Sequence, residues 1–440
     1  MTARETALKI LFSVETRKSF SDILLSKTLE RSGFEKREKD FVTNIVRGTL
    51  IWKGKIDYFL NEIRKEGIDG LPGWIRTILR MGTYEILFLD GVPARATVDE
   101  AVKLAKKFGH PGTAGLVNAV LRKVAAGKDD IRLPEKEKSP TKYLAICYSH
   151  PEWIVERWLK RFGFDETEGL LKANNERTGL SIRVNRVKSG VDEIRSTLLG
   201  RGVIVEEAKY SRSNLTVSGS FSPVECPEFQ GGLFTIQDES ESLVAFLLDP
   251  HENEVIVDLC AAPGGKCTHI AENANDKCII AAVELYPHRV KKLVSNVRRL
   301  GLSSVRPVVA DGRAPGIRSA DRVLVDAPCS GLGVLGKRPD ARWRKKESSI
   351  AKMSELQLEL LFSASSIVRK GGVLVYSVCS FEPEETSSII ERFIREKKEF
   401  SLESGEGFLP GEVLDERGIM KTFPHLHGTD GAFAARFVRN

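Results

Sequence analysis

The chain has 440 residues, of which 41% are hydrophobic and 29% charged, and this suits two or three packed domains. It has no run of about 18 apolar residues, which argues against a membrane-spanning helix. The net charge is +7, and residues 1–127 alone hold 22 Lys and Arg against 15 Asp and Glu, so the remainder is neutral. A basic end on a neutral body is typical of a nucleic-acid anchor, although a solvated helical surface explains it equally well.

The seven cysteines are scattered and odd in number, and no Cys-x-x-Cys pair occurs. This spacing argues against a zinc ribbon and against a dithiol redox motif, so we expect no metal site. It favours reduced thiols and a cytoplasmic location.

Residues 1–127 have apolar side chains at helical spacing and are predicted to form only helices. Within them, Thr97 followed by Glu100 predicts a capping box, with Thr97 as the N-cap. Residues 128–141 are polar, charged and broken by two prolines, which indicates a linker. Residues 142–240 combine helical and strand patterns and predict a small α+β domain.

Residues 241–440 alternate apolar, β-branched runs with helical segments, which predicts an α/β fold with a mostly parallel sheet covered on both faces. Ligands of such folds bind beyond the carboxyl ends of the strands. The predicted strands are 254–260, 278–285, 305–310, 322–328 and 371–378.

A glycine-rich turn follows the first of these strands. Its glycines allow a tight turn and a close approach of backbone to ligand. The helix that starts near its end presents free N–H groups to a carboxylate or phosphate. It is not a P-loop, because the G-x-x-x-x-G-K-[ST] pattern is absent. The turn consists of Cys260, Ala261, Ala262, Pro263, Gly264, Gly265 and Lys266.

Acidic residues end the second and third strands. Glu284 is suited to a ribose diol, and Asp311 is suited to accept from an adenine amino group. Taken singly, each acid is more simply explained as a loop residue that caps a helix. Taken together with the glycine-rich turn, they predict an adenosine-containing ligand.

Two cysteines follow the fourth and fifth strands, Cys329 and Cys379, and Asp326 precedes the first by three residues. Neighbouring parallel strands would place both thiols at one edge, beside the predicted ligand. This set suits methylation of a pyrimidine at C5, because a thiolate added to C6 makes C5 nucleophilic toward a sulfonium methyl group. Asp326 would offset charge developing at N3, and a second thiol can assist release. Spacing alone does not rank the two thiols.

Four motifs at these positions, CAAPGGK, VDAPCSGLG, RPDARW and YSVCS, resemble those of the RNA cytosine-C5 methyltransferases. The likeness is strongest to the bacterial Sun/RsmB type, which modifies small-subunit ribosomal RNA. Residues 1–127 resemble the NusB-type RNA-binding domain of that type, and 142–240 resemble its middle region. The resemblance implies a class I, Rossmann-like methyltransferase domain with a mostly parallel seven-stranded sheet, preceded by a small α+β domain and an all-α NusB-like domain.

The resemblance also implies site roles. S-adenosylmethionine would be the cofactor, held by the turn of residues 260–266 with Glu284, Asp311 and Asp326. Cys379 would be the nucleophile and Cys329 would assist product release. The Glu-Asn-Val motif of DNA enzymes, which use the Pro-Cys cysteine as nucleophile, is absent, and this favours the same assignment.

Two positions depart from the family pattern. Val378 stands where the family usually has Thr, and Glu284 where Asp is frequent. Neither change removes a needed group.

The implied substrate is a cytosine of 16S ribosomal RNA before the subunit is fully assembled, and the implied state is a monomer without membrane or metal partners. A transfer-RNA cytosine-C5 methyltransferase and a non-catalytic RNA-binding or antitermination factor stay open as alternatives. An adenine N6 methyltransferase would show Asn/Asp-Pro-Pro-Tyr where this chain has Asp-Ala-Pro-Cys. Arg338, Arg342 and Trp343 are candidates either for RNA contact or for a basic turn with the Trp in the core.

Overall fold

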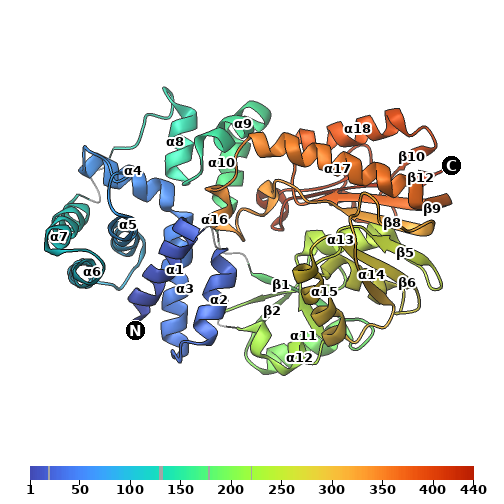
Figure 1. Cartoon of the computed structure of the whole chain (residues 1–440), viewed down its shortest axis with the longest axis horizontal. Helices are drawn as coiled ribbons and strands as arrows, with labels where there is room; N and C mark the ends of the chain where they lie inside the picture. Colours follow the sequence, from blue (N-terminus) through green and yellow to red (C-terminus); the bar gives the residue numbers. More distant parts are fainter. Residues whose placement is uncertain (18–19, 128–131, 177–178, 220) are drawn as a thin grey trace. The chain divides into compact units, whose positions relative to one another are not determined.

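The computed structural model of the chain divides into two compact units. The N-terminal unit comprises residues 1–175 and 335–345, and the C-terminal unit comprises 176–334 and 346–440 (Figure 1). The residues that the structure describes are 1–17, 20–127, 132–176, 179–219 and 221–440.

The N-terminal unit contains helices and no strand within its described residues, so the prediction of an all-helical region over 1–127 is confirmed. The helices are α1 (Ala3–Arg17), α2 (Ser21–Glu30), α3 (Lys36–Ile51), α4 (Lys53–Ile63), α5 (Gly73–Phe88), α6 (Ala94–Phe108), α7 (Pro111–Ala126), α8 (Pro140–Cys147), α9 (Glu152–Phe162), α10 (Phe164–Ala173) and α16 (Pro339–Arg342).

Helix α3 shows why this region folds as helices. Val42, Ile45 and Val46 recur at helical spacing and are fully buried in the core of the unit. A Cβ at Gly48 would lie 1.9 Å from Cζ of Tyr84, so glycine here leaves room for the ring of Tyr84 against α3.

The capping box predicted at Thr97 is wrong. Helix α6 begins three residues earlier, at Ala94, directly after Pro93. Thr97 lies inside the helix, where its Oγ1 donates to Oε2 of the buried Glu85 at 3.3 Å. Glu100 pairs instead with Lys103, with Nζ and Oε1 2.7 Å apart. The tertiary contact with α5, which a local pattern does not contain, decides where Thr97 points.

The segment of residues 335–345 carries the RPDARW motif into the core of the N-terminal unit. Arg342 is fully buried, and its Nη1 donates to the carbonyl of Ser149 at 3.1 Å and to Oδ1 of Asn175 at 2.8 Å. Burial lowers the pKa of Arg342 to about 9. Nε1 of Trp343 donates to the carbonyl of Leu50 at 2.9 Å. Arg342 is therefore a core residue, and the half-buried Trp343 is anchored to the end of α3.

The boundary between the units falls after residue 175, inside the range 142–240 that was expected to form one α+β domain. Helices α8, α9 and α10 belong to the helical unit, and α8 packs against α4. Periodicity predicts α9 correctly but does not indicate what its apolar face packs against.

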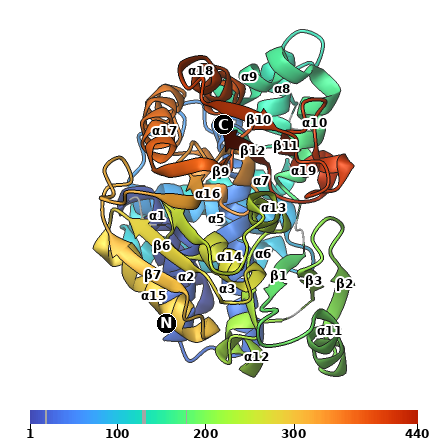
Figure 2. The ribbon, with the colours of Figure 1, turned by 90° about the vertical axis from the view of Figure 1, so that its right-hand side faces the viewer.

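The C-terminal unit opens with a small antiparallel sheet of strand order β2-β3-β1-β4, which confirms the predicted α+β character. Helix α11 packs against β2 and β3 (Figure 2). The elements are β1 (Leu180–Val184), α11 (Val191–Gly200), β2 (Ile204–Glu207), β3 (Asn214–Ser218), α12 (Pro227–Gln230) and β4 (Phe234–Ile236).

The large sheet has the order β10-β12-β9-β8-β5-β6-β7, with the short β11 paired to β12. Strands β5 to β9 are parallel, whereas β12 is antiparallel to its neighbours β9 and β10. The five predicted strands and the mostly parallel seven-stranded sheet are confirmed, and β11 is an addition. The strands are β5 (Val255–Asp258), β6 (Ile279–Glu284), β7 (Val305–Val309), β8 (Ala320–Asp326), β9 (Val368–Val378), β10 (Phe400–Glu403), β11 (Met420–Thr422) and β12 (Ala432–Arg439).

Helices cover both faces of this sheet (Figure 1). Successive residues of a strand enter different cores: Leu324 packs with the cluster that includes α13 and α14, and Val325 with the cluster that includes α17 and α18. This explains why the strands are apolar on both faces. The helices are α13 (Glu239–Leu248), α14 (Gly265–Asn273), α15 (Pro287–Leu300), α17 (Ser348–Ile367), α18 (Ser387–Glu396) and α19 (Pro424–His427).

Arg183 of β1 ties the small sheet to α14, the helix that follows the glycine-rich turn. The guanidinium is fully buried and forms a two-point ion pair with Glu272, with Nη2 2.6 Å from Oε1 and Nε 3.0 Å from Oε2. Its Nη1 donates to the carbonyl of Gly265 at 2.6 Å. The small sheet thereby supports the first turn of α14.

We expect Arg183→Met to lower the free energy of unfolding by about 3–5 kcal/mol, because Glu272 would be left as an unpaired buried charge. Urea unfolding measures the loss, and the exposed Arg186→Met is the matched control. Adding Glu272→Leu to Arg183→Met should restore part of the stability. Equal urea midpoints for Arg183→Met and wild type would show that the pair contributes nothing.

Candidate active site

The two cysteines singled out by the sequence lie together in the structure. Strands β8 and β9 are parallel neighbours in a register that pairs Asp326 with Ser377. The loops that follow both strands therefore meet at one edge of the sheet, and Sγ of Cys329 lies 3.1 Å from Sγ of Cys379. Both residues are partly exposed, so a substrate can reach them.

Asp326 is the point where three segments meet. Ser377 of β9 donates its hydroxyl to Oδ1 of Asp326 at 2.9 Å. Nζ of Lys266 lies 2.9 Å from Oδ2, which brings the glycine-rich turn to the end of β8. The sequence analysis assigned Lys266 to the cofactor alone, and its contact with the carboxylate was missed.

The glycine-rich turn has the conformation that its sequence predicts. Gly264 adopts φ +111°, and a Cβ there would lie 2.8 Å from Cδ1 of Leu293. Helix α14 begins at Gly265, and the Ala262–Pro263 peptide bond is cis. The N–H of Ala261 donates to the carbonyl of Val283 at 2.9 Å, which anchors the turn to β6.

Asp258, at the end of β5, gives the turn an acceptor of its own. Oδ1 accepts the N–H of Cys260 at 3.2 Å. Oδ2 is buried and has no hydrogen-bond partner among the described residues. A buried acceptor of this kind fits a ligand that brings a donor or a positive charge. S-adenosylmethionine carries both an ammonium and a sulfonium group, so these residues fit it.

Burial raises the pKa of Asp258 to about 7, and the nearby charge of Asp326 adds to the rise. The native carboxyl therefore keeps its proton at pH values where the unfolded chain has lost it. This contribution to stability is present at low pH and is lost as the pH rises through about 7.

We therefore expect the stability difference between wild type and Asp258→Asn to change by up to about 4 kcal/mol between pH 4 and pH 8, at about 1.4 kcal/mol per unit of pKa. Wild type should lose stability relative to the variant as the pH rises. Urea unfolding of both ligand-free proteins across this range measures the difference. Parallel pH profiles would contradict the raised pKa.

The two acids at the ends of β6 and β7 lie against the turn. Oε1 of Glu284 accepts the N–H of Tyr286 at 3.0 Å, and Oε2 pairs with Nη1 of Arg289 at 3.0 Å. Nη2 of Arg289 donates to the carbonyl of Ala262 at 2.7 Å, so it links Glu284 to the turn. Glu284 thus makes a contact with a backbone N–H, as expected of a loop residue that caps a helix, and it also lies beside the glycine-rich turn.

Asp311 is held by Arg313, whose Nη2 lies 2.7 Å from Oδ2. Hydrogen bonds from Arg313 lower the pKa of Asp311. A Cβ at Gly312 would lie 2.8 Å from the carbonyl oxygen of Leu259, so this loop packs directly on the residue between Asp258 and Cys260.

Burial and the carboxylates around it raise the pKa of the Cys260 thiol well above its ordinary range. The hydrogen bond with Cys379, followed by burial, raises the pKa of Cys329 well above its usual value. Cys260 and Cys329 are therefore favoured as neutral thiols. Val378, which stands where the family usually has Thr, is buried in the apolar core.

The sequence analysis missed a buried polar cluster beneath the cysteines. It consists of Ser330, Gln357, Tyr376, Ser380 and Glu385. The signal in the sequence was the serine that follows each cysteine.

Within the described ranges, no helix is long and apolar enough to cross a membrane. No cluster of three or more His, Cys, Asp or Glu side chains in the same ranges has an arrangement that could hold a metal ion.

Three family models match consecutive parts of the chain. Residues 1–126 match the NusB family, residues 150–224 match the ferredoxin-like domain of RsmF/B-like methyltransferases, and residues 245–438 match 16S rRNA methyltransferase RsmB/F. The order is that of the helical, α+β and α/β regions described above.

Whole proteins and solved structures agree with this assignment. A protein of Bacillus subtilis named probable ribosomal RNA small subunit methyltransferase B is 34% identical over 98% of this chain and 97% of its own. A Synechocystis protein of the same name is 33% identical over 100% of both chains. The crystal structure of PH0851 is similar over 100% of this chain and 99% of its own, with a TM-score of 0.86 and 31% identity. NSun6 from Pyrococcus horikoshii, solved with SFG, has a TM-score of 0.59 and 25% identity over 64% of this chain and 97% of its own. The chain belongs to the RsmB/F family of S-adenosylmethionine-dependent ribosomal RNA cytosine-C5 methyltransferases.

Proposed function

We propose that this protein methylates C5 of a cytosine in 16S ribosomal RNA, with Cys379 as nucleophile and Cys329 as the thiol that assists release. The observation that carries this proposal is the 3.1 Å separation of the two sulfurs beside the Asp326–Lys266 ion pair. A single structural cysteine needs neither a second thiol nor a carboxylate at the same strand ends.

The cofactor is assigned to the glycine-rich turn of residues 260–266, with Asp258, Glu284, Asp311 and Asp326. The N–H groups at the start of α14 suit the carboxylate of the ligand, and the unpartnered Oδ2 of Asp258 suits a cationic group. Bound S-adenosylmethionine supplies the electrophilic methyl group for C5.

The residues of this chain act on the base. Cys379, as thiolate, adds to C6, so that electron density moves onto C5. Asp326, in the protonated form for part of the cycle, bonds to the N3 and N4 edge of cytosine, and its proton offsets the negative charge that develops at N3. Lys266 and Ser377 hold both oxygens of that carboxyl group, which fixes its orientation.

After methyl transfer, C5 must lose its proton and Cys379 must leave C6. Cys329 lies next to Cys379 and has a raised pKa, so it is a neutral thiol when Cys379 is ionised. A neutral thiol can protonate the departing sulfur, and the thiolate that this leaves on Cys329 can accept the C5 proton directly or through water, so that the protons balance.

The relatives named small subunit methyltransferase B support 16S ribosomal RNA as the substrate. The target base must leave its stack to reach the thiols, and single-stranded loops permit this most readily. We therefore propose RNA that is not yet fully assembled into the subunit as the substrate, a monomer as the active form and the cytoplasm as the location.

Methyl transfer from labelled S-adenosylmethionine to three RNAs tests the proposal: 16S transcript, assembled small subunit and transfer RNA. Bisulfite sequencing then identifies the modified cytosine. Label on the free 16S transcript is expected. Label on transfer RNA alone would favour a transfer-RNA enzyme, and absence of cofactor binding would favour a non-catalytic RNA-binding factor.

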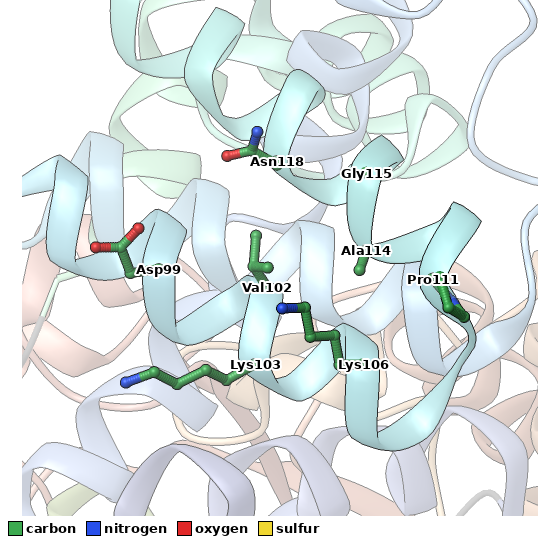
Figure 3. A pocket seen from close by; sticks show the side chains of 8 residues that line it. All are labelled: Asp99, Val102, Lys103, Lys106, Pro111, Ala114, Gly115 and Asn118. Atoms are coloured by element: carbon green, nitrogen blue, oxygen red, sulfur yellow. The ribbon is translucent and has the colours of Figure 1, made fainter.

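The N-terminal unit offers a basic surface for the RNA. An open hollow of about 800 Å³ lies between α6 and α7, and the exposed Lys103 and Lys106 border it together with Asp99 and Asn118 (Figure 3). Cationic side chains beside an amide group suit a phosphate backbone.

We expect the double replacement Lys103→Glu and Lys106→Glu to weaken RNA affinity at low salt and to reduce the slope of log affinity against log salt by about 2. Filter binding over a salt series measures the slope. The exposed Lys138→Glu with Lys160→Glu is the matched control in the same unit. An unchanged slope would remove this surface from the RNA interface.

A further inference from the structure

Glu385 is a fully buried carboxylate beneath the two cysteine loops, at the end of a short 3-10 helix (Pro383–Glu385). Its Oε1 accepts the N–H of Ser330 at 2.6 Å and Nε2 of Gln357 at 3.0 Å. Its Oε2 accepts the hydroxyl of Ser380 at 2.6 Å and that of Ser330. One carboxylate thus binds the loop after β8, the loop after β9 and helix α17.

The two serines connect this carboxylate to the cysteines. Ser330 directly follows Cys329, and Ser380 directly follows Cys379. The serine hydroxyl oxygens lie 3.1 Å apart, as do the cysteine sulfurs. Glu385 therefore holds the serine that follows each cysteine, through the backbone N–H and hydroxyl of Ser330 and through the hydroxyl of Ser380, and sets the distance between the two loops.

A second set of contacts fixes the carboxylate itself. Nε2 of Gln357 also donates to the carbonyl of Pro328 at 2.9 Å, just before Cys329. The hydroxyl of Tyr376 donates to Oε1 of Gln357 at 3.1 Å and to the main-chain carbonyl of Glu385 at 2.7 Å. A buried carboxylate is unfavourable unless it is fully hydrogen-bonded, and here four donors satisfy it.

We propose that Glu385 is a positioning residue that keeps Cys329 within reach of Cys379 during the release step. This inference rests on the proposed roles of the two thiols. Glu385 acts through the Cys-Ser pairs, since its oxygens are occupied by the donors of Ser330, Ser380 and Gln357.

Two substitutions separate position from charge. Glu385→Ala removes all four hydrogen bonds and frees the loops. Glu385→Gln keeps an acceptor for the Ser330 N–H, and its amide can donate to the two serine hydroxyls, which rotate to accept. Positioning therefore predicts a large effect of Ala and rescue by Gln. Glu391→Ala, on the exposed face of α18, is the matched control.

The first readout needs neither RNA nor cofactor. Diamide takes two electrons and two protons from a pair of thiols, which become a disulfide while its azo bond is reduced to a hydrazine. We expect the Cys329–Cys379 disulfide, identified by peptide mass spectrometry, to form at least about tenfold more slowly in Glu385→Ala, and at the wild-type rate in Glu385→Gln and Glu391→Ala. Cys329→Ala gives the background.

The second readout is turnover. Glu385→Ala should lower kcat by about tenfold or more and accumulate a covalent RNA adduct that survives denaturing gels, with KM for RNA within about twofold of wild type. If Glu385→Ala does not fold, Ser380→Ala cuts one of the four hydrogen bonds and should show the same effects at smaller size.

Wild-type rates of disulfide formation in folded Glu385→Ala would overturn the proposal, as would failure of Glu385→Gln to rescue. If instead wild-type enzyme forms no adduct and Cys379→Ala stays active, the thiol roles are wrong. The diamide rates would still report whether Glu385 sets the distance between the sulfurs, so the two failures are distinguishable.

Discussion

Cys379→Ala is expected to abolish methyl transfer, with kcat/KM lower by at least about 10⁴-fold, and to leave no covalent RNA adduct. Without a thiolate at C6, C5 of cytosine is not nucleophilic enough to take the methyl group. Transfer of label to 16S transcript measures the loss, and denaturing gels of enzyme mixed with RNA and cofactor report the adduct.

The binding of cofactor provides the control for this variant. Because the proposed role of Cys379 is to attack the base and not to hold the cofactor, Cys379→Ala should bind S-adenosylmethionine with the affinity of wild type. A variant that retains a tenth or more of the wild-type rate would exclude Cys379 as the nucleophile.

Cys329→Ala is expected to stop turnover at the release step, after methyl transfer, whereas Cys379→Ala stops it before methyl transfer. Cys379 can still add to C6 and the methyl group can still be transferred, but release of the adduct lacks its thiol. Turnover should fall by about 10²-fold or more, while a methylated, covalent RNA–protein complex accumulates and survives denaturation. Peptide mapping should locate the RNA on Cys379.

Cys278→Ala is the matched control. Cys278 is a buried cysteine that directly precedes β6, at the end of that strand away from the two cysteine loops. It should leave turnover and adduct levels unchanged. An adduct in Cys379→Ala together with none in Cys329→Ala would exchange the two roles.

The edge of the sheet at which the site lies can be predicted from the sequence, because a few features of the sequence are enough to recognise parallel strands. Five apolar runs separated by helices imply parallel strands, and the residues after β8 and β9 must then share one end. The structure agrees with this expectation, because the sulfurs of Cys329 and Cys379 lie 3.1 Å apart.

Contacts between segments distant in the chain were not predictable in the same way. Glu385 receives donors from loops 55 and 5 residues away and from a helix 28 residues away, and nothing in PEET marks it as buried. Thr97 has the local pattern of a cap, yet it faces Glu85. Periodicity and local propensity describe a segment, whereas these side chains are governed by what the segment packs against.

The segment of residues 335–345 has a consequence for synthesis on the ribosome. The N-terminal unit takes its buried Arg342 from a part of the chain translated about 160 residues after Asn175. Residues 1–175 therefore emerge with the carbonyl and amide groups that bind this guanidinium still unpaired. The N-terminal unit completes its core only after the loop of Cys329 has been made, so a nascent chain that stalls before residue 345 holds an unfinished N-terminal unit.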